Sequence, residues 1–211
     1  MRTLFVFLIS AVVAFFCLPA FSQTSVIGPP NGLEWGMSYP EAKVLLKSKG
    51  IDLEDLKEEK KTKLPKGFKF AKVGKYEILN KKTDDNIAFF NADGELCAFR
   101  INFCFQESEP NKATSEVVRF WNDELKTAIA SKYSGEGFKV YGSKEKHESD
   151  QDGSKLALGF EDEVGNEISV YLSPGKKCCL GMRAEAWISI FYNNEEILKA
   201  TRAERKATDK F

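Results

Sequence analysis

NIAFFNADGELCAFRINFCFQ, residues 86–106, is the stretch that decides the fold of this chain. Two runs rich in aromatic and β-branched residues flank Ala92-Asp93-Gly94-Glu95, and an Asp-Gly pair between such runs is a strong signal for a β-hairpin. In the second run apolar and polar residues alternate. The alternation places five residues on one face: Cys97, Phe99, Ile101, Phe103 and Phe105. We therefore predict two strands, 86–91 and 96–106, with one side of the second strand in the core.

Two amphipathic helices are predicted on either side of this hairpin. The first begins at Ser38, where Pro40 lies in the first turn and Glu41 completes a capping box, and it ends at Gly50. The second spans residues 112–132. Its apolar residues recur at helical spacing: Val117, Val118, Trp121, Leu125, Ala128 and Ile129.

Alternating apolar residues predict further strands at 68–70, 76–78, 138–141, 156–160, 168–172 and 184–190. Residues 52–66 are highly charged and are interpreted as a surface connection, and Asn194 is expected to cap a charged C-terminal helix that is solvated or lightly docked. Helices combined with a mostly antiparallel sheet define the α+β class. The order helix, strands, helix, strands suggests two tandem repeats, 32–108 and 111–192, in which the turn regions 90–96 and 160–168 correspond.

Residues 1–22 have the features of an export signal. A positive start at Arg2 is followed by the apolar run Leu4–Phe16, and Ala20-Phe21-Ser22 offers small residues where a signal peptidase reads. The run is shorter than the roughly 20 residues of a membrane-spanning helix, and Phe15-Phe16 stand where a bacterial lipobox has small residues. We expect a soluble mature protein, residues 23–211, that is periplasmic or secreted. Retention as a membrane anchor is the alternative.

The composition excludes some classes of partner. Without residues 1–22 the chain has 30 basic and 31 acidic residues. A near-neutral balance argues against nucleic acid, because phosphate binding needs an excess of Lys and Arg. Twelve Phe and three Trp lie beyond residue 22, and they are sufficient for a sizeable core. The sequence thus predicts a folded domain that has no nucleic-acid partner and no stable membrane insertion after signal removal.

Motifs for catalysis or metal binding are weak. His147 is the only histidine, lies in a polar stretch and has no accompanying Gly-x-Ser-x-Gly motif, so it is interpreted as an exposed loop residue. Asp150-Gln151-Asp152-Gly153 is similar to the start of a calcium loop, but Lys155 stands where that loop needs glycine. Glu161-Asp162-Glu163 is interpreted as a solvated turn. No catalytic residue, metal or cofactor is expected.

The cysteines are constrained by their spacing. Cys97 and Cys104 are seven residues apart on one predicted strand, about 23 Å, whereas a disulfide needs Cα atoms within about 7 Å. Cys178 and Cys179 are adjacent and cannot bridge two distant partners. At most one disulfide is therefore expected, either a single cross-link or the vicinal pair, and Cys97 is a candidate buried thiol.

One predicted strand face carries aromatics among polar residues. Trp187 and Phe191 point opposite to the apolar side of the last strand, and Tyr171 does so in the preceding one. Aromatics on an otherwise polar face are typical of interaction surfaces, so these three are the candidate partner-binding residues. The alternative is burial beneath a helix, such as the C-terminal one, or beneath the other half of the molecule.

Residues 32–41, GLEWGMSYPE, resemble the opening segment of small exported bacterial proteins in which a Gly-Met-Ser or Gly-Met-Thr step caps a helix. With the turn at 90–96, the pattern over residues 32–106 is similar to SmpA/OmlA-type lipoprotein domains. It is also similar to β-lactamase-inhibitor-protein-like domains, which are tandem α/β repeats. The chain departs from both in lacking a lipobox and in its long charged stretch, 52–66. The resemblance implies an interaction module and transfers no catalytic residue.

These observations lead to the expectation of a non-catalytic binding or interaction module of the cell envelope whose partner is another envelope protein. One alternative is an envelope hydrolase, which would need two carboxylates converging in a cleft. The other is a carrier of an apolar small ligand, which would need a large aromatic-lined cavity.

Overall fold

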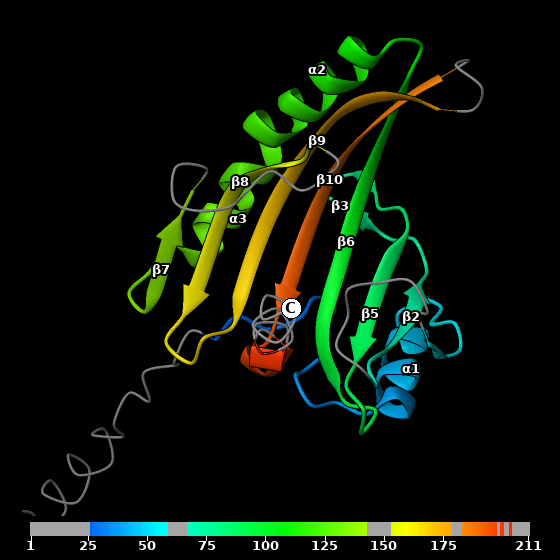
Figure 1. Cartoon of the computed structure of the whole chain (residues 1–211), viewed down its shortest axis with the longest axis vertical. Helices are drawn as coiled ribbons and strands as arrows, with labels where there is room; N and C mark the ends of the chain where they lie inside the picture. Colours follow the sequence, from blue (N-terminus) through cyan, green and yellow to red (C-terminus); the bar gives the residue numbers. More distant parts are fainter. Residues whose placement is uncertain are drawn as a thin grey trace, which may run out of the picture.

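The computed structural model describes residues 26–58, 67–142, 153–178, 183–197, 199–200 and 203. Within these ranges, eight strands form one antiparallel sheet in the order β1-β2-β5-β6-β10-β9-β8-β7, and β3 pairs only with β4 (Figure 1). Helices are few, so the protein is mainly β within the predicted α+β class. The predictions for residues 1–22, His147, Asp150–Asp152 and Cys179 lie outside the described residues.

The predicted strands are present, with additions. The strands are β1 (Lys57–Glu58), β2 (Lys69–Val73), β3 (Glu77–Ile78), β4 (Lys81–Lys82), β5 (Asn86–Phe90), β6 (Leu96–Glu107), β7 (Phe138–Tyr141), β8 (Lys155–Asp162), β9 (Glu167–Cys178) and β10 (Arg183–Asn193). The interpretation of 52–66 as a surface connection is wrong for its first residues, because β1 pairs with β2 and Leu53 is buried in the core.

The β5–β6 hairpin forms as predicted, but a bulge alters its faces. Phe89 pairs with Ala98 and Phe90 pairs with Leu96, which leaves Cys97 as the extra residue. An extra residue interrupts the strict alternation of side chains. Cys97 is therefore buried with Ala98 in a small cluster apart from the main core, and the prediction that it shares the face of Phe99 is wrong.

The first helix, α1 (Tyr39–Ser48), begins as its capping box predicts. The Glu41 carboxylate accepts hydrogen bonds from the Ser38 backbone N–H (3.0 Å) and hydroxyl (2.6 Å), and these bonds lower the pKa of Glu41. The chain leaves the helix through Gly50, whose φ of 71° favours glycine. α1 buries Ala42 and Leu46 in the main core.

The second predicted helix contains a π-helical turn. It comprises α2 (Pro110–Phe120), the π-helical segment η2 (Trp121–Leu125) and α3 (Lys126–Tyr133), and the Lys126 N–H bonds to the Trp121 carbonyl, five residues back. Buried residues recur here at intervals of four: Val117, Trp121, Leu125, Ile129 and Tyr133. In a regular α-helix, four residues make about 400° and the buried stripe drifts by about 40° per step. The wider turn reduces this drift, and Val118, predicted on the apolar face, is 43% exposed.

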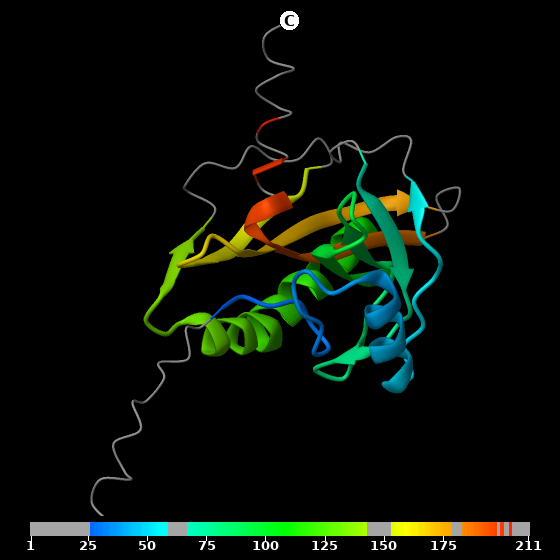
Figure 2. The ribbon, with the colours of Figure 1, turned by 90° about the horizontal axis from the view of Figure 1, so that it is seen from below.

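The main core lies between the helices and one face of the sheet. α2 packs across β6, β9 and β10, where Phe120 contacts the rings of Phe103 and Phe105 at centroid distances of 5.3 and 5.7 Å. Figure 2 shows α1, α2 and α3 on this same side of the sheet. Near one end of β9, Gly175 approaches the Pro110 carbonyl so closely that a side chain would overlap it. The described residues therefore form a two-layer architecture in which α1, α2 and α3 pack on one face of the sheet.

Two turns of identical hydrogen bonding lie at one end of the sheet. In the β5–β6 turn, the Asn91 side-chain oxygen accepts the N–H groups of Asp93 and Glu95 at 3.1 and 2.9 Å. In the β8–β9 turn, Asp162 Oδ1 accepts those of Val164 and Asn166 at 3.1 and 2.8 Å. Asp162 is 6% exposed, so the interpretation of residues 161–163 as a solvated tip is wrong for this carboxylate.

The C-terminal helix begins between these turns. Asn194 caps it as predicted, because its side-chain oxygen accepts the Ile197 N–H at 3.0 Å. Its first turn is docked. Glu196 contacts Asn91, the Glu195 N–H bonds to Asn166, and Ile197 packs on Cys97. The described start of this helix therefore covers only one end of the second sheet face.

Candidate functional site

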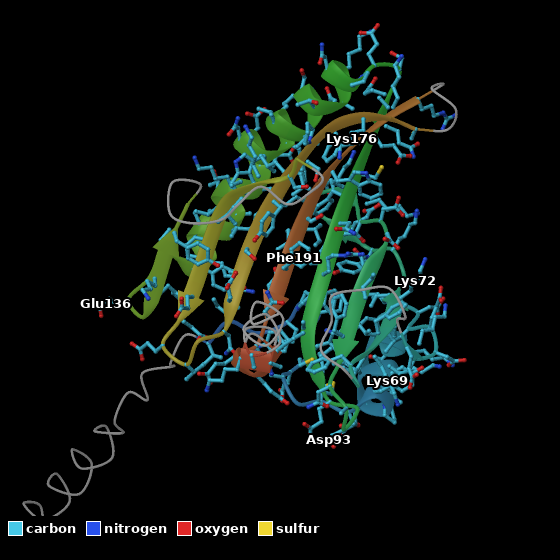
Figure 3. All side chains as sticks on the ribbon, in the orientation of Figure 1. Lys69, Lys72, Asp93, Glu136, Lys176 and Phe191 are labelled. Carbon is cyan, nitrogen blue, oxygen red and sulfur yellow. The ribbon has the colours of Figure 1, made fainter. Side chains whose placement is uncertain are left out.

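The candidate site lies on the sheet face opposite α1, α2 and α3, which we call the open face. Figure 3 shows Phe191 near the middle of this face, whereas the charged residues Lys72, Asp93, Glu136 and Lys176 lie toward its periphery. Ile197 covers Cys97 and Ala98 rather than the predicted aromatic residues. Among the residues that the structure describes, the side chains of β6, β10 and β9 form the centre of the open face.

Strand register determines which residues meet there. β10 pairs with β6 on one side and β9 on the other, and directly opposite residues share a face. Three rows cross β6, β10 and β9 on the open face: Arg100, Phe191 and Ser169; Asn102, Ser189 and Tyr171; and Cys104, Trp187 and Ser173. The predicted partner-binding residues are therefore neighbours, although Tyr171 comes from a different strand.

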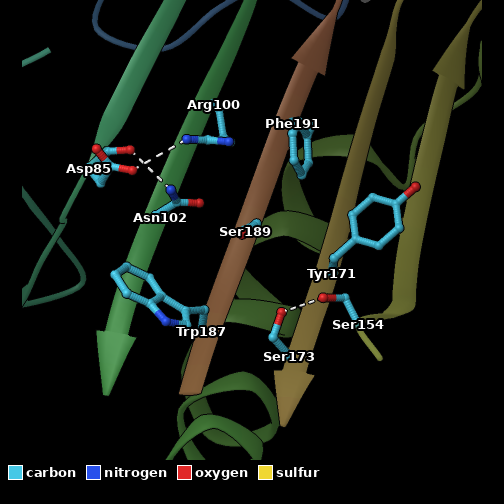
Figure 4. Close-up of a pocket in the computed structure, with 9 residues that line it drawn as sticks. All are labelled: Asp85, Arg100, Asn102, Ser154, Tyr171, Ser173, Trp187, Ser189 and Phe191. Atoms are coloured by element: carbon cyan, nitrogen blue, oxygen red, sulfur yellow. Dashed lines mark hydrogen bonds and ion pairs between the residues drawn. The ribbon is translucent and has the colours of Figure 1, made fainter. Parts of the chain in front are cut away.

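These rows surround a hollow of about 330 Å³. Its lining residues, drawn in Figure 4, are Asp85, Arg100, Asn102, Ser154, Tyr171, Ser173, Trp187, Ser189 and Phe191. The volume is at the low end of the range of about 300–1,000 Å³ for small-ligand sites. We refer to this group of nine residues as the sheet hollow.

The aromatic residues of the sheet hollow are partly buried and mutually oriented. Tyr171 and Phe191 pack edge to face, with centroids 5.6 Å apart and ring planes at 89°. Figure 4 shows the ring faces of Tyr171 and Trp187 toward the open side, whereas Phe191 is seen nearly edge-on. The packing against Phe191 holds Tyr171 as a broad apolar surface available to a bound group.

Asn102 forms the polar floor of the sheet hollow. Its backbone N–H donates to the Asn86 side chain (3.2 Å), its carbonyl accepts the Asp84 N–H (2.7 Å), and its side-chain Nδ2 donates to the Asp85 carbonyl (3.0 Å). The remaining atom, Oδ1, has no hydrogen-bond partner among the described residues, and it is buried in a residue that is 6% exposed. An unsatisfied buried acceptor costs about 1–3 kcal/mol, so this oxygen can gain stabilisation from a donor that enters the hollow.

Asp85 provides the charged wall. It has a left-handed backbone conformation (φ 48°), which Asp tolerates better than most residues. Its carboxylate lies 3.4 Å from the Arg100 guanidinium and 3.6 Å from the Lys72 ammonium. Both pairs are partly exposed and so contribute little to stability. Their effect is to place opposite charges side by side, so that the lining of the hollow has no net charge.

The open face was partly predictable. The alternation of apolar and polar residues in β10 and β9 correctly indicates that Trp187, Phe191 and Tyr171 point away from the main core. The alternation in β6 places Asn102 on the polar face of that strand. No sequence signal marks Asp85 or Ser154 as members of the site. Asp85 takes its position from its left-handed backbone conformation just before β5. Ser154 lies just before β8, 52 residues from Asn102 along the chain.

The described cysteines do not line the sheet hollow, although Cys104 lies opposite Trp187. Cys97 and Cys104 both lie in β6, as predicted, and both are free thiols. Burial raises the pKa values of Cys97 and Cys104 to about 12. Because the thiolate is the reactive form, both groups are poor nucleophiles at neutral pH.

Other chemistry finds little support in the described part of the chain. Within it, the sheet hollow contains one carboxylate, Asp85, whereas glycosidase-type acid–base catalysis uses two. No group of three or more His, Cys, Asp or Glu side chains in that part is arranged to hold a metal ion. Among the described residues, no helix combines the length and apolar character needed to cross a bilayer.

Comparison of the chain with protein-family models, with characterised proteins and with solved structures gives no match.

Proposed function

We propose that this protein is a non-catalytic binding module of the cell envelope, and that it contacts its partner through the open face. One observation carries the proposal: the sheet hollow, in which Trp187, Tyr171 and Phe191 lie among polar side chains on the face opposite the helices. Partly buried aromatics at the centre of a concave polar surface are typical of sites where a few residues supply most of the binding energy.

The cellular location is part of this proposal. A positive start, an apolar run of signal length and small residues near position 22 support export of residues 23–211 to the periplasm or the exterior. The resemblance of residues 32–41 to exported SmpA/OmlA-type and β-lactamase-inhibitor-protein-like domains supports an interaction role. The single carboxylate of the described hollow favours binding over hydrolysis.

We also infer that the chain consists of two tandem halves, 32–108 and 111–192. Strand order supports this. In the first half, α1 precedes β1, β2, β5 and β6, which form one half of the sheet. In the second half, α2 and α3 precede β7–β10, which form the other half. The turns at 90–96 and 160–168 are not equivalent in this arrangement. The first joins the third and fourth strands of its half, whereas the second joins the second and third.

Site-directed cross-linking tests the binding role. A photoreactive residue is introduced at Phe191, and at Val118 on the helical layer as the matched control, in the tagged, exported protein. After irradiation in the native envelope, mass spectrometry identifies the adducts. We expect a stoichiometric adduct from position 191, weakened by Trp187→Ala, and none from position 118. Equal labelling from both positions would remove the open face from consideration.

A further inference from the structure

The lining of the sheet hollow selects against two classes of ligand. The two charged residues of the lining form an ion pair, in which the Asp85 carboxylate lies 3.4 Å from the Arg100 guanidinium. The lining therefore has no excess positive charge to bind a multiply charged anion. A purely apolar ligand would leave Asn102 Oδ1 without a donor and would cover Ser173 and other polar groups without replacing their contacts with water, which is unfavourable. The ligand that fits is uncharged and polar, and it also has an apolar surface.

The ring orientations specify that apolar surface. Trp187 and Tyr171 turn their ring faces to the open side of the hollow, on strands that neighbour each other in the sheet (Figure 4). Large flat rings bind best to another flat or gently curved apolar surface. Polar groups lie around these rings, namely Asn102 on β6, Ser173 on β9 and Ser154 before β8.

The hydrogen-bonding groups specify the edge of the ligand. Asn102 Oδ1 is a buried acceptor without a partner in the part of the chain that the structure describes, and Figure 4 shows it directed from β6 toward Ser189 on β10. It requires a donor. Ser154 and Ser173 pair with each other at 2.5 Å, and each hydroxyl can donate and accept. Groups that both donate and accept, such as hydroxyls, suit this mixed lining better than pure donors or pure acceptors.

Resting on the proposed function, we infer that the sheet hollow binds a short stretch of an uncharged saccharide. Sugar rings present C–H faces that stack on Trp187 and Tyr171, and their hydroxyls donate to Asn102 Oδ1 and exchange hydrogen bonds with Ser173. The volume of about 330 Å³ limits the bound portion to a short segment, and the hollow is open on one side among the described residues, where a longer chain can continue across the sheet. The envelope component that the module recognises is then a glycan rather than a protein surface.

Direct binding tests this inference on the mature protein, residues 23–211. A printed glycan array identifies binding glycans, and isothermal titration with soluble neutral tetrasaccharides, cellotetraose, chitotetraose and maltotetraose, measures affinity. Trp187→Ala and Tyr171→Ala are expected to weaken binding by about tenfold each, whereas Trp187→Phe restores most of it. Val118→Ala, on the helical layer, is the matched control and leaves affinity unchanged. If Trp187→Ala does not fold, Ser189→Leu fills the hollow with a side chain that a strand tolerates.

The outcomes are distinct. Saturable binding of a neutral glycan that these variants weaken supports the inference. Binding restricted to anionic glycans, or binding that Trp187→Ala and Ser189→Leu leave unchanged, overturns it. If no neutral glycan binds but the photoreactive residue at Phe191 captures a protein, the saccharide inference fails and the proposed binding role stands. If neither glycan nor protein is bound at the open face, both fail.

Discussion

Replacing Asp162 by asparagine tests whether one buried carboxylate joins the N-terminal segment to the β8–β9 turn. Oδ1 holds the turn through two backbone N–H groups. Oδ2 accepts the Ile27 N–H at 2.7 Å and the Asn166 side-chain amide at 3.0 Å. Asn91 shows that an asparagine supports the same turn with its single oxygen. The substitution should therefore preserve the turn and lose only the two bonds to Oδ2.

The expected cost follows from these two bonds. Each buried donor left without a partner costs about 1 kcal/mol or more, so Asp162→Asn should destabilise the protein by about 2 kcal/mol and Asp162→Ala, which removes all four bonds, by about 4 kcal/mol. Urea unfolding followed by tryptophan fluorescence measures this. With a slope of about 2 kcal/mol/M, the midpoint for Asp162→Asn should fall by about 1 M. Asp93→Asn, at an exposed turn position, is the control.

Hydrogen exchange localises the effect. In Asp162→Asn the Ile27 amide should lose protection, whereas the Val164 amide, which bonds to the retained oxygen, should keep it. A loss of stability below about 0.5 kcal/mol, the range of an ordinary surface substitution, would refute the reasoning. So would unchanged protection at Ile27.

Four other predictions concern packing and the thiols. Gly175→Ala should destabilise the protein by about 1–3 kcal/mol, because the new side chain would overlap the Pro110 carbonyl. Gly135→Ala is the control and should cost little stability, because its new side chain would meet no described atom. Thermal melts compare the two variants, and equal melting temperatures would contradict the close approach at Gly175. Because burial raises the pKa of Cys97 to about 12, native Cys97 should react with iodoacetamide at pH 8 far more slowly than in urea, as peptide mapping would show. As the pH rises, the Cys97 thiol ionises in the unfolded chain before it ionises in the folded protein. The contribution of Cys97 to stability should therefore be complete below about pH 9 and be lost as the pH rises toward 12. A free energy of unfolding that stays constant over this pH range would contradict this. Intact-mass measurement of the exported protein should show no more than one disulfide, and two would be incompatible with the β6 strand.

Local sequence determined the elements. The capping box at Ser38, the Asp-Gly turn at 93–94 and the alternation in β6 beyond Ala98 act within a few residues of one another, and these three features appear as predicted. The same local period correctly assigned Trp187, Phe191 and Tyr171 to the face opposite the core. Such features are readable because propensity and periodicity depend on near neighbours along the chain.

Only the tertiary structure decided how those elements meet. The bulge at Cys97, the burial of Asp162 and the π-helical turn at Trp121 each depend on partners distant along the chain, such as Ile197, Ile27 and the sheet beneath the helices. The sheet hollow itself exists because β6 and β9 flank β10 in one register, which brings Asn102 and Tyr171 to either side of Ser189. A shift of one residue would turn these side chains to the other face. The sequence thus determines which residues are available on each strand face, and long-range strand pairing decides which of them form a site.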